Sequence, residues 1–123
     1  MSYAILVVDD EAMMARIFEQ RLRKEIREGL LTLHFATSAQ QALAIVDEVG
    51  YQLVLILTDI NMPGMSGFEL LKNVRARYPA IKIYIASAYD NEEYHQKALD
   101  LGADGWFSKP MDFSEFKALL EGA

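Results

Sequence analysis

The chain contains no cysteine, and this absence excludes disulfide bonds, thiolate metal sites and cysteine nucleophiles. No apolar run approaches the roughly 20 residues that a membrane-spanning helix requires, so contact with a membrane is not expected. Met1 and Ser2 lead directly into a strand pattern, without the basic segment and the cleavage site of a secretion signal. The lack of a membrane span and of a secretion signal predicts a cytoplasmic protein.

Positive charge is also scarce in this sequence. Its 123 residues include 12 lysines and arginines against 18 aspartates and glutamates, which gives a formal net charge of -6. Nucleic-acid binding needs a basic face, so direct nucleic-acid binding by this domain is not expected. The short length and the lack of an internal repeat or a low-complexity linker predict one domain over residues 1–123.

Five apolar segments have the composition of buried β-strands. The longest begins at Leu53, consists almost entirely of leucine, valine and isoleucine, and stops at a single carboxylate, Asp59. An apolar run without polar alternation suits a strand that is buried on both faces, as in a parallel sheet covered by helices. The other strands are predicted at residues 3–8, 31–36, 81–86 and 105–107.

Apolar residues three and four positions apart predict five helices between and after these strands. The first runs from Met14 through Leu22 and ends at Gly29. The other four open with a capping-box pair, Ser38 with Gln41, Ser66 with Glu69, Asp90 with Glu93, and Asp112 with Glu115. Five β-α units with short connections require right-handed crossovers, so we expect a single α/β domain of three layers with a doubly wound parallel sheet.

The carboxyl ends of the strands in such a sheet lie along one edge, where ligands bind. The residues predicted at this edge are Asp9, Asp10, Asp59, Asn61, Ser87 and Lys109. Three converging carboxylates repel one another unless a cation lies among them, and a set of oxygen ligands favours Mg²⁺ (or Mn²⁺). A cation, the ammonium of Lys109 and the hydroxyl of Ser87 around Asp59 suit a site that holds a phosphoryl group on that carboxylate.

Four features in this order resemble the receiver domain of two-component response regulators, over almost the whole chain. They are the acidic pair Asp9 and Asp10, Asp59 with the segment MPGMSG at 62–67, Ser87 before Ala88, and Lys109 before Pro110. The resemblance implies a flavodoxin-like fold with five helices and the strand order 2-1-3-4-5. It also implies that Asp59 is the phosphoacceptor.

The resemblance assigns the metal to four of these residues. Asp10, Asp59 and the backbone carbonyl of Asn61 would bind the ion directly, and Asp9 would bind it through a water molecule.

The resemblance assigns the response to the phosphoryl group to three further side chains. Ser87 and Lys109 would contact the group, Ser87 and Trp106 would form the switch, and the peptide bond from Lys109 to Pro110 would be cis. Trp106 departs from the family pattern, which usually has tyrosine or phenylalanine at this position.

As a receiver domain, the chain would take a phosphoryl group from a phosphohistidine of a histidine kinase or a histidine phosphotransfer protein. Phosphorylation would switch the face made by the fourth helix, the fifth strand and the last helix, about residues 91–101, 105–107 and 113–120. That face would act on an output domain or protein, or form a homodimer. The chain would be a signalling phosphoacceptor that assists its own phosphorylation and slow dephosphorylation, not an enzyme.

Two other functions remain open from the sequence. A phosphatase with an aspartate nucleophile also places Asp at a strand end with Mg²⁺, but it uses an acid-base carboxyl two residues later, where this chain has Asn61. A receiver-like interaction domain without phosphorylation would keep only the fold, and the acidic pair, Ser87 and Lys109 disfavour it. His34 and His95 are interpreted as surface or strand-edge residues, because neither has a second ligand at metal spacing.

Overall fold

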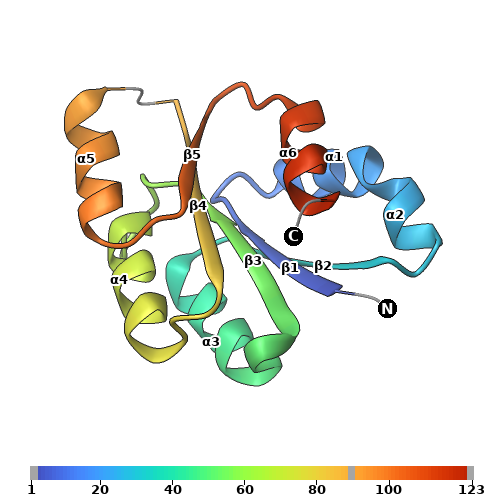
Figure 1. Cartoon of the computed structure of the whole chain (residues 1–123), viewed down its shortest axis with the longest axis horizontal. Coiled ribbons are helices and arrows are strands. Elements are labelled where there is room, and N and C mark those ends of the chain that lie inside the picture. Colours follow the sequence, from blue (N-terminus) through green and yellow to red (C-terminus); the bar gives the residue numbers. More distant parts are fainter. Residues whose placement is uncertain (1–2, 89–90, 122–123) are drawn as a thin grey trace.

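The computed structural model describes residues 3–88 and 91–121. Five strands alternate with helices along the chain (Figure 1). The elements are β1 (Tyr3–Val8), α1 (Met13–Arg21), α2 (Arg23–Arg27), β2 (Leu31–Ala36), α3 (Ala39–Val49), the 3₁₀ turn η1 (Gly50–Gln52), β3 (Leu53–Thr58), α4 (Gly67–Arg77), β4 (Lys82–Ser87), α5 (Glu92–Asp100), β5 (Gly105–Ser108) and α6 (Phe113–Glu121). In this part of the chain, every helix is too short or too polar to cross a membrane.

The five strands form one parallel sheet in the order β2-β1-β3-β4-β5, as expected. Helices α3, α4 and α5 cover one face, and α1, α2 and α6 cover the other (Figure 1). Side chains of the central strands alternate between two hydrophobic clusters: Leu6 and Ile56 point to the first face, and Ile5 and Leu57 to the second. The central strands are therefore buried on both sides, which explains their continuous apolar sequence.

The strand predictions agree closely with the structure. The first three strands have the predicted bounds, and the fourth lies one residue later than expected. The fifth strand extends to Ser108, because this residue pairs with Ser87 of β4.

Six α-helices are found among the described residues, where five were expected. The additional one arises because the first predicted helix is divided at Leu22, whose φ of -106° and ψ of 14° depart from helical values. The amide of Leu22 still donates to Phe18 and its carbonyl accepts from Ile26, at 2.9 and 3.0 Å. The two pieces thus form one helical segment with a break at a buried residue.

Three of the four predicted helix caps are confirmed. The side chains of Ser38, Ser66 and Asp112 accept hydrogen bonds from the amides of Gln41, Glu69 and Glu115, at 3.1, 3.2 and 3.4 Å. The predicted cap Asp90 lies outside the described residues. The residue after it, Asn91, caps α5 by accepting from the amide of Tyr94 at 2.9 Å.

Arg75 of α4 joins the turns at the amino ends of β4 and β5. Its Nε and Nη2 atoms donate to the carbonyl of Gly102, and Nη1 donates to the carbonyls of Pro79 and Ile81. Nη2 also donates to Asp104 at 2.8 Å. A guanidinium group has five N–H donors, and these five contacts engage all its nitrogens, so Arg75 fixes the end of the sheet opposite the polar edge.

Candidate functional site

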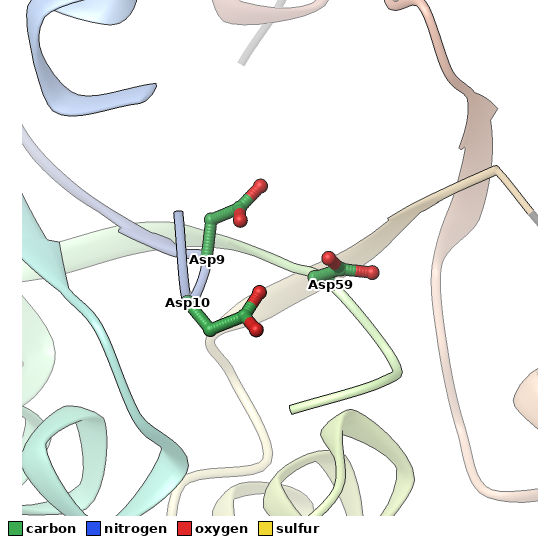
Figure 2. A group of neighbouring side chains, drawn as sticks. All are labelled: Asp9, Asp10 and Asp59. Carbon is green, nitrogen blue, oxygen red and sulfur yellow. The ribbon is translucent and has the colours of Figure 1, made fainter. Parts of the chain in front are cut away.

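Three aspartates from two neighbouring strands meet at the carboxyl edge of the sheet. Asp9 and Asp10 follow β1, and Asp59 follows β3, in a position held by a 2.9 Å hydrogen bond from its amide to the carbonyl of Val8. One carboxylate oxygen of each lies within 4.8 Å of the others, and Figure 2 shows the three side chains beside one another. Asp9 is buried, Asp59 is half-buried and Asp10 is exposed. This group has the ligand chemistry of a site for a hard divalent cation.

Lys109, which follows β5, reaches into the same group. Its Nζ atom lies 2.8 Å from Oδ2 of Asp9 and 3.1 Å from Oδ2 of Asp59. Burial lowers the pKa of Lys109, but hydrogen bonds and charge from Asp9 and Asp59 outweigh burial, so the pKa is raised above its usual value. The lysine therefore stays charged at neutral pH and offsets part of the repulsion among the carboxylates.

Each of these two carboxylates is also fixed by the backbone. Oδ1 of Asp9 accepts a hydrogen bond from the amide of Glu11 at 2.9 Å, and Oδ1 of Asp59 accepts from the amide of Ile60 at 2.7 Å. One oxygen of each carboxylate thus faces an amide and the other faces Lys109. Hydrogen bonds from backbone amides to a charged carboxylate fix its orientation.

The backbone of Asp59 packs directly against Gly67, which the sequence marks only as the last residue of the segment MPGMSG. A Cβ atom on Gly67 would overlap the carbonyl oxygen of Asp59 and lie 2.9 Å from Cα of Ile60. The amide of Gly67 donates to the carbonyl of Ile60 at 2.8 Å, and the hydroxyl of Thr58 donates to the carbonyl of Asp59 at 2.9 Å. Glycine is therefore required at 67 because the start of α4 packs directly on the backbone of Asp59.

A pocket of about 270 Å³ opens beside Asp59. It is lined by Asp10, Glu11, Asp59, Asn61, Ala88 and Lys109. Five of these residues follow β1, β3 or β5, so most of the predicted edge residues converge on one pocket. Ser87 is different: it is fully buried at the end of β4, and the wall of the pocket is made by the next residue, Ala88.

Comparison with known proteins agrees with this geometry. Residues 5–121 match the family described as the response regulator receiver domain. The chain belongs to this family.

The receiver domain is also similar to curated regulators and to solved structures. It is 38% identical over 119 residues to the transcriptional regulatory protein ZraR of Escherichia coli, covering 97% of this chain and 26% of that protein. It is 34% identical over 116 residues to the transcriptional regulatory protein MalR of Bacillus subtilis, covering 94% of this chain and 48% of that protein. The chain thus spans half or less of the length of these relatives.

Two solved structures show the same architecture. The chemotaxis protein CheY4 of Vibrio cholerae has a TM-score of 0.86 and 26% identity, with 98% of both chains covered. A CheY-like receiver domain protein of Methanospirillum hungatei has a TM-score of 0.88 and 26% identity, with 99% of this chain and 93% of that one covered. The flavodoxin-like receiver fold is therefore shown.

Two further predictions concern β5 and the residues that directly follow it. The peptide bond from Lys109 to Pro110 is cis, as the resemblance implied. Trp106 is half-buried and packs against the hydrophobic cluster under α3, α4 and α5. It also stacks on His95 of α5, a contact that was not predicted, since His95 was expected at the surface or at a strand edge.

Proposed function

We propose that Asp59 accepts a phosphoryl group from the phosphohistidine of a histidine kinase or a histidine phosphotransfer protein. The observation that carries this proposal is the contact of one ammonium with two carboxylates. Lys109 lies 3.1 Å from Oδ2 of Asp59 and 2.8 Å from Asp9, at a pocket that Asp10 and Asn61 also line. The amide of Ile60 holds Oδ1 of Asp59, and Oδ2 is the oxygen that contacts Lys109.

The donor set fits Mg²⁺, or Mn²⁺ in its place. Asp10, Asp59 and the backbone carbonyl of Asn61 would hold the ion, and the buried Asp9 would act through a water molecule. All are hard oxygen donors, and one oxygen of each of the three carboxylates lies within 4.8 Å of the others. When bound, the ion supplies positive charge that offsets the negative charge developing on the transferred group.

In the transfer, an oxygen of Asp59 attacks the phosphorus atom in line with the leaving imidazole. The new P–O bond forms as the P–N bond breaks, and the imidazole leaves with the bonding electron pair. Lys109 then shifts its contact from the carboxylate to the phosphoryl oxygens. Ser87 would turn its hydroxyl toward the same oxygens, and this movement opens the space that Trp106 needs to act as the second member of the switch.

The output surface of the phosphorylated domain is α5, β5 and α6. Trp106 lies in β5, and Lys109, which lines the pocket, follows that strand directly, so this surface should respond to changes at the pocket. Couplings of this kind are about 1 to 3 kcal/mol, which shifts a population without fixing it. The same face would bind an output domain or protein, or a second copy of the chain.

The domain is a signalling phosphoacceptor and not a turnover enzyme. Rapid hydrolysis of an aspartyl phosphate needs a carboxyl group that transfers a proton to or from the attacking water. Asn61 lines the pocket two residues after Asp59, and its amide does not transfer protons. The aspartyl phosphate should therefore persist, unlike the intermediate of an aspartate-nucleophile phosphatase.

The extent of the domain is proposed to be residues 1–123. Because the chain matches only part of each curated relative, any activity of their remaining parts is not carried over. We expect the domain to act in the cytoplasm, without direct contact with nucleic acid or membrane.

The test is incubation of the chain with acetyl phosphate and Mg²⁺, followed by intact mass spectrometry. A stable single phosphoryl adduct is expected for the wild type, and none for Asp59→Asn, which keeps the shape and removes the nucleophile. Asp100→Asn on α5 is the matched control and should be phosphorylated normally. Rapid phosphate release would support the phosphatase, and no adduct at all would support an interaction domain without phosphorylation.

A further inference from the structure

The imidazole of His95 and the indole of Trp106 form a stacked pair. Their ring centroids are 4.1 Å apart and their planes differ by 26°. His95 lies on α5 and Trp106 on β5, and both are half-buried. The imidazole of His95 thus covers one face of the indole.

The indole is held by packing rather than by hydrogen bonding. Its Nε1 atom is buried, and no acceptor for it is found among residues 3–88 and 91–121. Burying a donor without an acceptor is unfavourable, so contacts of the ring must offset that cost. The core supports one part of the ring and His95 supports another.

The residue before His95 makes a second aromatic contact. Tyr94 packs edge-on against Phe68 of α4, with centroids 5.6 Å apart and planes at 85°. Phe68 follows Gly67, which packs on the backbone of Asp59. Tyr94 and His95 therefore contact α4 and β5, and each of these two elements adjoins a residue of the pocket.

Trp106 is close to the pocket along the sheet as well. It lies three residues before Lys109, and its register partner on β4 is Ile85, two residues before Ser87. Movement of Lys109 or Ser87 toward a phosphoryl group would act on the strand ends that flank the indole. The stack is present together with the direct contact of Lys109 with the carboxylate of Asp59, so it belongs to the free-carboxylate arrangement.

We propose that His95 is a positioning residue: its ring holds Trp106 in the resting position and thereby opposes phosphorylation of Asp59. The proposal rests on the phosphoacceptor function proposed above. An interaction that stabilised the free and the phosphorylated states equally would not change the equilibrium between them. His95 therefore acts by stabilising the free state more than the phosphorylated state.

His95 also lines an open surface pocket of about 420 Å³ along α5, together with Asn91, Glu92, Gln96 and Leu99.

The test is titration of the full chain with beryllofluoride in the presence of Mg²⁺, followed by ¹⁹F NMR, which does not depend on the tryptophan. An aromatic pair of this kind contributes enough to change an equilibrium about two- to tenfold. Removing the ring in His95→Ala should therefore lower the half-saturating concentration about two- to tenfold. His95→Gln is a second ring-free variant and should behave in the same way.

Two controls separate positioning from general packing. His95→Phe restores a stacking ring and should return the half-saturating concentration to the wild-type value. Leu99→Ala removes an exposed side chain that lines the same surface pocket as His95, and should leave that concentration unchanged. The fluorescence of Trp106, the only tryptophan in the chain, reports whether the stack is lost.

The outcomes distinguish this proposal from the proposed function. If wild-type protein binds beryllofluoride but the ring-free variants bind it equally well or more weakly, the positioning role of His95 is overturned and the phosphoacceptor function stands. If wild-type protein does not bind beryllofluoride at all, both are overturned.

Discussion

The Nζ atom of Lys109 lies 2.8 Å from Oδ2 of Asp9, a residue one hundred positions earlier in the chain. This contact, together with the one to Asp59, connects the ends of β1, β3 and β5 through a single ammonium group. Only Asp10, of the three clustered carboxylates, is exposed. Lys109 thus forms ion pairs with the two less exposed carboxylates, and we expect Asp10 to bind a second cation.

Asp10→Asn should therefore weaken metal binding with little damage to the fold. Without metal, the substitution removes one of three mutually repelling charges, and we expect stability in EDTA to rise slightly, by up to about 1 kcal/mol. In millimolar Mg²⁺ the wild type should gain stability and the variant should not. Urea unfolding in EDTA and in Mg²⁺ measures both effects, and equal responses to Mg²⁺ would contradict a metal site at Asp10.

Gly67→Ala should damage both the fold and the phosphorylation of Asp59. The added Cβ would overlap the carbonyl oxygen of Asp59, and forcing atoms into a packed site costs about 1 to 3 kcal/mol or more. A shift of Asp59 should also slow phosphorylation, because in-line transfer depends on position. Unfolding midpoints and the rate of acetyl phosphate labelling are the measurements.

Gly64→Ala is the control for this substitution. Gly64 has a φ of 82° and no atom near its missing Cβ, so alanine there meets backbone strain without overlap. It should lose about 1 to 2 kcal/mol and label at nearly the wild-type rate. Similar labelling rates for the two variants would argue against a special role of Gly67.

Much of the fold could be predicted from the sequence because it depends on local patterns. Continuous apolar runs located the first three strands to the residue, and three helix caps follow from side chains three positions away. The extension of β5 to Ser108 depends on pairing with Ser87, which no local pattern contains. The break at Leu22 likewise lies inside an uninterrupted helical pattern.

The site also contains features that the sequence predicts and features that depend on tertiary contacts. Parallel topology places Asp9, Asp59 and Lys109 at one edge, so their approach could be predicted from strand order alone. The stack of His95 on Trp106 joins side chains of two elements, and helical spacing does not reveal which side chain of a strand a helix will meet. The burial of Ser87 depends on the direction of its side chain at the end of β4, which a local sequence pattern does not contain.

Arg75→Lys should destabilise the domain although it keeps the charge. The guanidinium group serves the carbonyls of Gly102, Pro79 and Ile81 and the carboxylate of Asp104, and its side chain is 24% exposed. An ammonium group does not reproduce this planar arrangement of donors, so several of these acceptors, some of them partly buried, would lose partners at a cost of about 1 to 3 kcal/mol. Chemical unfolding provides the value.

Arg77→Lys is the matched control for Arg75→Lys, two residues later on the same helix. Arg77 pairs with Asp47 at 3.1 Å, but the two side chains are 47% and 50% exposed. A solvent-screened pair of this kind contributes little, so the change should stay within about 0.5 kcal/mol. If Arg75→Lys lost no more free energy of unfolding than Arg77→Lys, the positive charge of Arg75 alone would be sufficient, and its hydrogen-bond geometry would not matter.

Tyr84→Phe should make the domain less sensitive to alkaline pH. Burial, and then the negative charge of Asp104, raise the pKa of Tyr84 above its ordinary value of 10.0. Above that value the unfolded chain loses the phenolic proton while the native state still holds it. The native state then binds more protons, so stability is fully present below pH 10.0 and falls as the pH rises through the raised pKa.

Phenylalanine keeps the ring that packs against Phe107, with centroids 5.9 Å apart, and removes the titration. In urea unfolding at pH 8 and at about pH 11, the variant should lose less stability than the wild type. An equal loss in both proteins would place the alkaline sensitivity at other groups.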